Sequence, residues 1–326
     1  MASPNNHSDS LAFAVKVLVA LRPVQYVDIV LGVVISLASA ISIMAIFMDT
    51  TLRRKNAYIL VSVLCFGYLV HSVGIAAKGT FAVVLDSQHQ STMQTMRECC
   101  MEWTVLVLGG EIIIDVSFVI AVDRCIAVFF PVLYRRKEKW WWLTSQLLVI
   151  VIHIAVALFR QLSSTSDEPI HLCTILTAID THVMVIMMVE FNIIVALTIV
   201  LYIIVITWAR QSIKKTANEG GNAAAQRKRL KWKLIVTMAL NMIVYSMTMF
   251  VGNISFTTAA IIDDQEAIIP LLIFGEVDHF SGFFGLCVLF FRMNEFRRAI
   301  FRLFNRKVGP VQPSETSKAD LSTKIN

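Results

Sequence analysis

Long apolar runs alternate along the chain with short polar segments. Seven runs are long enough to cross a membrane, because about 20 helical residues rising 1.5 Å each span the hydrocarbon core of a bilayer. In chain order the runs are Ile29–Met48, Ala57–Ala77, Trp103–Phe130, Trp140–Phe159, Val183–Thr207, Leu234–Ile262 and Ala267–Phe291. The pattern predicts an all-α membrane protein, a seven-transmembrane-helix bundle over residues 29–291. No internal repeat of the kind found in many transporter folds is visible.

Three further segments flank the bundle. Residues 1–28 precede the first span, and Leu11–Leu21 is expected to lie there as an interfacial helix. In residues 292–304 basic side chains alternate with large apolar ones, a spacing that predicts a short amphipathic helix on the inner leaflet. Residues 305–326 are polar and rich in Ser, Thr and Pro, which predicts a disordered tail.

Composition supports a bilayer as the solvent of most of the chain. The 326 residues are 56% hydrophobic and 16% charged, whereas a soluble domain carries about 25% charged residues. The net charge of +6 does not indicate nucleic-acid binding, because the basic residues gather in alternate loops. We expect no cofactor and no metal.

The distribution of charge predicts the orientation. The segments after runs one, three, five and seven are rich in Lys and Arg, and the opposite segments are mostly acidic. By the positive-inside rule the basic segments face the cytoplasm, so the amino terminus is extracellular and the carboxyl terminus cytoplasmic. The sequon at Asn6, Asn-His-Ser, agrees with an exterior amino terminus and predicts glycosylation there. We expect a multi-pass protein of the plasma membrane.

A charged doublet ends the third run. Asp123 and Arg124 follow a long apolar helix, and a basic cluster begins at Arg135. A charged pair in this place is costly unless it has a partner or a role. The string resembles the cytoplasmic end of the third helix in rhodopsin-like (class A) G-protein-coupled receptors, where Asp-Arg-Tyr is followed by a hydrophobic turn and Pro. Here Cys125 stands in place of the Tyr.

The resemblance implies contact between Arg124 and the carboxyl-terminal helix of a heterotrimeric G-protein α subunit. The residues it assigns to this coupling are Asp123, Arg124, Pro131, Tyr134, Arg135 and Arg136.

Other parts of the chain depart from that pattern. Span seven reads Gly285-Leu-Cys-Val-Leu289 where the family has Asn-Pro-x-x-Tyr, and Leu234–Ile262 contains no proline. With the doublet and Pro131 kept, the chain looks most like the divergent serpentine chemosensory receptors of nematodes. The resemblance also implies a disulfide between the start of span three and the loop after span four. Cys99–Cys173 is the favoured pair and Cys100–Cys173 the alternative.

Polar residues inside spans usually face the bundle interior and mark a site. We expect an extracellular small molecule or peptide, most simply a chemosensory cue, to bind among spans three, five, six and seven. Glu111 and Asp115 lie deeper and are assigned a structural or coupling role. The candidate ligand-binding residues are Glu102, Leu106, Met187, Glu190, Phe274 and Asp278.

Several other classes fit less well. A retinal protein needs a lysine in span seven, and Ala267–Phe291 has none. The acid typical of aminergic receptors, 18 residues before the arginine (124 − 18 = 106), is replaced by Leu106. A proton-coupled or small-solute transporter using the intramembrane carboxylates remains the alternative. An intramembrane hydrolase lacks a His-Glu-x-x-His motif and zinc ligands at helical spacing.

Overall fold

The computed structural model describes a chain that is almost entirely helical. The described residues are 5–87, 94–130, 132, 134, 139–170, 173–217, 236, 239–240, 243–244, 246–259, 262 and 265–305. The longer helices are α1 (Asn5–Met48), α3 (Asn56–Ser87), α4 (Met96–Phe129), α6 (Lys139–Ser163), α8 (Thr181–Ala217), α10 (Gln265–Gly275), α11 (Phe280–Arg292) and α12 (Asn294–Phe304). The shorter elements are α2 (Thr50–Arg53), α7 (Ile175–Ala178), the 3₁₀ turn η1 (Glu276–His279), and the strands β1 (Gln94–Thr95) and β2 (Pro169–Ile170).

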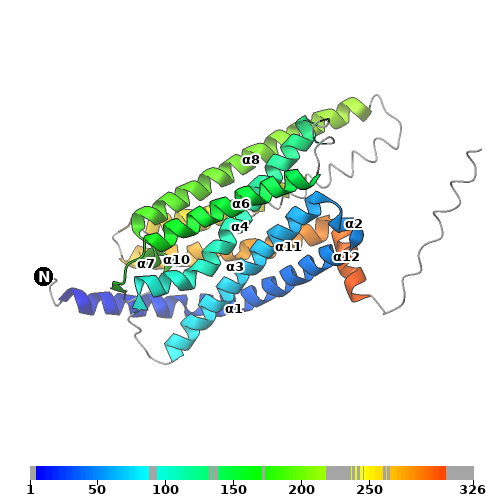
Figure 1. The fold of residues 1–326 in the computed structure, drawn as a ribbon. Coiled ribbons are helices and arrows are strands. Elements are labelled where there is room, and N and C mark those ends of the chain that lie inside the picture. Colours follow the sequence, from blue (N-terminus) through cyan, green and yellow to red (C-terminus); the bar gives the residue numbers. More distant parts are fainter. Residues whose placement is uncertain are drawn as a thin grey trace, which may run out of the picture.

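Within these residues, six helical segments are long and apolar enough to cross a membrane: Val19–Met48, Asn56–Val84, Met96–Phe129, Trp141–Ser163, Thr181–Trp208 and Ala267–Arg292. They overlap six of the seven predicted runs and confirm an all-helical membrane protein. The remaining run, Leu234–Ile262, lies partly outside the described residues, and its stretch 246–259 is helical. Figure 1 shows the spans running side by side as one bundle.

The first helix differs from the expectation. Leu11–Leu21 does not form a separate interfacial helix, because α1 continues without a break from Asn5 to Met48 with Pro23 inside it. Its amino-terminal part projects beyond the bundle (Figure 1). Arg22-Pro23 suggests a helix boundary in the sequence, since proline removes a backbone donor and usually breaks a helix. A long apolar helix tolerates such a proline, as membrane helices often do.

The central helix of the bundle is α4. In its most apolar segment 78% of the residues are buried, against 22% in α6 and 28% in α8. Small residues bring α3 onto it: a Cβ at Gly74 would lie 2.7 Å from the Leu106 Cα, so only glycine allows this approach. The outer faces of α6 and α8 expose large apolar side chains, among them Trp141, Val149, Phe159, Ile193 and Ile203. Such faces suit contact with lipid.

One end of the bundle, here called the disulfide end, is closed by a covalent link. Cys99 at the start of α4 is bonded to Cys173 ahead of α7, so the favoured pairing is present and Cys100 is a free, buried thiol. Beside the bond, β1 and β2 pair antiparallel, with Gln94 opposite Ile170. The loop after α6 is thereby fixed against the start of α4.

At the opposite end, the α12 end, a short helix follows the last span. The helix expected over residues 292–304 is present as α12, which turns across the bundle near α2 (Figure 1). Phe296 on its inner face is 1% exposed. Glu295 accepts hydrogen bonds from Lys55 Nζ at 2.7 Å and from the Tyr58 hydroxyl at 2.9 Å. These contacts tie α12 to the turn between α1 and α3. The predicted tail lies outside the described residues except for Asn305.

We predict that Cys173→Ala lowers the stability of the purified protein by about 2–5 kcal/mol, because a bond across 74 residues restricts the unfolded chain. Thermal unfolding in detergent measures the change. The matched control is Cys100→Ala, which removes a neighbouring buried thiol and leaves the bond intact. Equal melting temperatures for Cys173→Ala and the parent protein would contradict the prediction.

We predict that the Lys55–Glu295 pair makes a pH-dependent contribution to the stability of the folded protein. The hydrogen bond from Lys55 holds the pKa of Glu295 below its usual value of 4.5. The stabilisation is therefore full above pH 4.5 and is lost as the pH falls through the lower folded-state value. Glu295→Gln should lower the free energy of unfolding by less than about 1 kcal/mol at pH 7, since such exposed pairs contribute little. In strong acid it should not change the free energy of unfolding. In a Lys55→Gln background, Glu295→Gln should have a smaller effect on stability. A loss of stability that does not depend on pH would refute the role of the Lys55–Glu295 pair.

Candidate functional site

A small cavity lies inside the bundle, toward the disulfide end. Its volume is about 40 Å³, room for about three water-sized groups. The walls come from α3, α4, α8, the helical stretch 246–259, η1 and the segment after α7. The apolar lining includes four methionines, Met184, Met187, Met188 and Met249, with Phe191 and Phe256. Methionine side chains are flexible, so the cavity can reshape around a larger guest.

Three of the predicted ligand-binding residues line this cavity: Leu106, Met187 and Asp278. The other three lie elsewhere. Glu102 accepts a hydrogen bond from Gln94 at the disulfide end, Phe274 is 58% exposed on the outside of the bundle, and Glu190 belongs to an ion-pair cluster described below. Sequence reasoning missed Asn253 and most of the methionines, because an apolar residue in a span gives no sign of facing a cavity.

Two polar residues of the lining have acceptor atoms without a hydrogen bond. His71 Nδ1 lies 3.0 Å from the Leu106 carbonyl oxygen. A carbonyl can only accept, so Nδ1 carries the proton and Nε2 presents a lone pair. Within the described part of the chain, neither His71 Nε2 nor Asp278 Oδ1 has a hydrogen-bond partner, and both atoms are buried.

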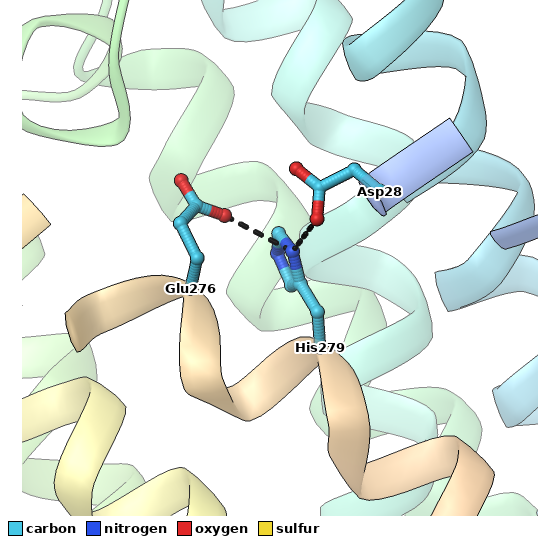
Figure 2. Close-up of side chains that lie close together, drawn as sticks. All are labelled: Asp28, Glu276 and His279. Carbon is cyan, nitrogen blue, oxygen red and sulfur yellow. Dashed lines mark hydrogen bonds and ion pairs between the residues drawn. The ribbon is translucent and has the colours of Figure 1, made fainter. Parts of the chain in front are cut away.

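Next to the cavity, a group of charged side chains joins α1, α3 and η1. We call it the His279 cluster: Asp28, Lys78, Glu276 and His279. Figure 2 shows His279 between two carboxylates, with Nδ1 3.0 Å from Asp28 Oδ1 and 3.0 Å from Glu276 Oε2. Lys78 Nζ lies 2.6 Å from Glu276 Oε1 and 4.4 Å from the centre of the Trp103 ring. The pairing of Asp28 with span seven has no local signal in the sequence.

A second group, the His153 cluster, joins α4, α6 and α8. His153 lies between Asp115 and Glu190, at 2.9 Å from each carboxylate. Arg160 pairs with the other oxygen of Glu190. Both oxygens of Glu111, 1% exposed, lack a hydrogen bond within the described residues, and one lies 3.9 Å from His153. Through Asp115, His153 and Glu190 the cluster joins three spans, and the structural or coupling role expected for Glu111 and Asp115 stays a prediction.

Each cluster contains three groups whose ligand atoms lie within 4.8 Å of one another: Asp28, Glu276 and His279, and Glu111, Asp115 and His153. Imidazole and carboxylate are donors that a zinc-type ion accepts. Each cluster also has a protein cation at its edge, Lys78 or Arg160. Ion pairing between helices therefore accounts for both without a metal.

At the α12 end, α4 presents the charged doublet. Arg124 Nη2 lies 3.2 Å from Asp123 Oδ2. The buried Asp123 also accepts hydrogen bonds from Trp142 Nε1 at 3.0 Å and from the Tyr134 hydroxyl at 3.3 Å. Arg124 Nε and Nη2 are buried and donate no hydrogen bond within the described residues. The Asp123 carboxylate thus has its hydrogen bonds, whereas the Arg124 guanidinium has donors that make none within the described residues. Pro131, Arg135 and Arg136 lie outside the described residues.

Beside the doublet, α4 packs on α8. Cys125 and Val128 contact the buried Val205, and the rings of Phe129 and Trp208 lie 5.0 Å apart. One helix pair thus lines the cavity near one end and holds the doublet at the other.

The described helices thus form a multi-pass bundle of membrane-spanning length with an internal cavity and an Asp-Arg pair at the α12 end. The chain matches the serpentine type 7TM GPCR chemoreceptor Srsx family over residues 30–304. This match covers most of the chain, so the protein belongs to that family, the nematode-type serpentine chemoreceptors expected from the sequence. It is a family of receptors and not of enzymes. No curated protein matches the chain.

We predict opposite outcomes for two neighbouring glycines of α4. A Cβ at Gly110 meets only His71 Nδ1, at 4.0 Å, whereas a Cβ at Gly109 would overlap the His71 backbone. Gly110→Ala should therefore keep the melting temperature or raise it, since alanine favours helix by about 1 kcal/mol. Gly109→Ala should separate α3 from α4 and reduce folded yield. Thermal unfolding and surface expression measure both; a stable Gly109→Ala protein would contradict the packing.

Proposed function

We propose that this protein is a chemosensory G-protein-coupled receptor that binds a small extracellular molecule in the cavity and activates a heterotrimeric G protein through Arg124. The observation that carries the proposal is that α4 holds both features. Gly110 lines the cavity and Arg124 follows 14 residues later (124 − 110 = 14), about 21 Å along the helix. A helix shift caused by a ligand would therefore act directly on the doublet.

The proposed orientation follows from charge and redox chemistry. The disulfide end would be extracellular, where cystine is stable, and the basic α12 end cytoplasmic. Seven spans, with Leu234–Ile262 as the sixth, would then place the two termini on opposite sides of the plasma membrane. Asn6 would carry a glycan, and α12 would lie on the inner leaflet with its apolar face inward.

The proposed route of activation starts at η1. A stretch of 3₁₀ helix within a longer helix often marks a hinge, and η1 lies between α10 and α11 in the last span. A Cβ at Gly252 would lie 3.1 Å from the Asp278 Cβ, so the stretch 246–259 packs closely on η1. A ligand that prefers one arrangement of these helices shifts the population toward it. The proposed result is an open cytoplasmic surface around Arg124, supported by Asp123, Tyr134 and the segment containing Pro131, Arg135 and Arg136.

The transporter alternative is not favoured. Transport needs a continuous polar path, and the walls of the cavity are mostly apolar. Two intramembrane carboxylates of the His153 cluster, those of Asp115 and Glu190, are engaged in pairs that hold helices together.

We predict that Arg124→Ala abolishes receptor-driven nucleotide exchange, reducing it at least about tenfold, because charge-assisted contacts to the G protein are lost. The measurement is loading of a non-hydrolysable GTP analogue on Gα in membranes, with a panel of small odorants as stimuli. Arg97→Ala is the matched control, since Arg97 forms an exposed pair with Asp167 at the other end. Full exchange by Arg124→Ala at equal surface expression would refute the role of the doublet.

A further inference from the structure

We infer that the cavity takes a small organic amine, bound as an ammonium ion whose N–H groups face Asp278 and His71. The inference rests on the proposed function and names the chemical class of its ligand. The proposed acid, Asp278, lies in the last span. The acid typical of aminergic receptors lies in span three, where this chain has Leu106.

The first argument is the supply of acceptors. Both polar residues at issue line the cavity, and within the described residues His71 Nε2 and Asp278 Oδ1 make no hydrogen bond. A buried acceptor without a donor destabilises the protein. An ammonium group carries only donors, which suits a site with two free acceptors, whereas a carboxylate or a ketone would add further acceptors.

The second argument is charge. Three carboxylates, those of Asp28, Glu276 and Asp278, lie in or next to the His279 cluster. Lys78 is directed at Glu276 at 2.6 Å, and its position over the Trp103 ring holds it there. Within the described part of the chain, the ion pair of Asp278 is with His279 Nε2, at 3.6 Å and without a hydrogen bond. Even a protonated His279, shared with Asp28 and Glu276, leaves negative charge in excess.

The third argument is the shape and lining of the remaining wall. The methionines and Phe191 surround a compact space of about 40 Å³, which suits a short alkyl body once the flexible methionine side chains adjust. The rings of Phe191 and Phe256 also border the cavity, and an aromatic face attracts an ammonium ion. A polyamine would leave a second charge in this apolar wall without a partner, so a monoamine fits better.

The test uses three ligands that differ only in the head group: n-butylamine, n-butanol and butyrate. Each is added to the purified full-length receptor at neutral pH, and the melting temperature is measured as a function of concentration. The amine should stabilise the protein at concentrations at least about tenfold lower than the alcohol, and butyrate should not stabilise it.

Asp278→Asn should remove the preference for the amine. Asp167→Asn, the same change at an exposed position of the disulfide end, should keep it. Gly110→Ala, which narrows the cavity, should weaken the binding of the amine and of the alcohol alike. If Asp278→Asn does not fold, the comparison of amine and alcohol on the parent protein still decides.

Equal effects of amine and alcohol on the parent protein, no stabilisation by the amine, or an unchanged preference in Asp278→Asn would each overturn the inference. The melting measurement needs no G protein. A receptor that drives nucleotide exchange with a neutral odorant and ignores the amine would keep the proposed function and refute the ligand class. A receptor that the amine stabilises but that drives no nucleotide exchange would keep the ligand class and refute the proposed function.

Discussion

Water is absent from the core of a bilayer, so every charge placed there needs a partner within the protein. This constraint organises the structure. The His279 cluster joins α1 and α3 to η1, the His153 cluster joins α4 to α6 and α8, and Asp123 joins α4 to Trp142 of α6. Since hydrophobic burial does not drive helices together in lipid, these polar contacts and the close approach at glycines determine which helices are neighbours.

The polar groups of the spans differ in how completely their hydrogen-bonding atoms are satisfied. Asp123 accepts two hydrogen bonds in addition to its ion pair, which fixes the end of α4. Arg124 keeps buried donors free within the described residues, and Asp278 and His71 keep acceptors free beside the cavity. Within the described residues, buried atoms without a hydrogen bond therefore occur at Arg124 and beside the cavity, and also in the His153 cluster at both oxygens of Glu111.

Span seven lacks the usual proline motif but contains a 3₁₀ stretch, η1. Span seven lacks the Asn-Pro-x-x-Tyr of related receptors, yet its helix is interrupted at η1. A short 3₁₀ stretch within a longer helix often marks a functional hinge or a strained sequence. Asp278 borders the cavity, so the interruption and the candidate ligand site coincide. A 3₁₀ turn here can supply the flexibility that proline supplies elsewhere.

Sequence alone determined the membrane class, six of the spans and the helix α12, because hydrophobic length and amphipathic spacing are local properties that a bilayer reads directly. It also indicated the doublet and, through resemblance, the Cys99–Cys173 bond. It misjudged α1 at Pro23, and it could not separate the candidates that line the cavity (Leu106, Met187 and Asp278) from those that do not (Glu102, Glu190 and Phe274). Only the tertiary structure decided these points: Asp28 and His279 are 251 residues apart in the chain, and such contacts depend on how helices rotate and pack, which no single span encodes.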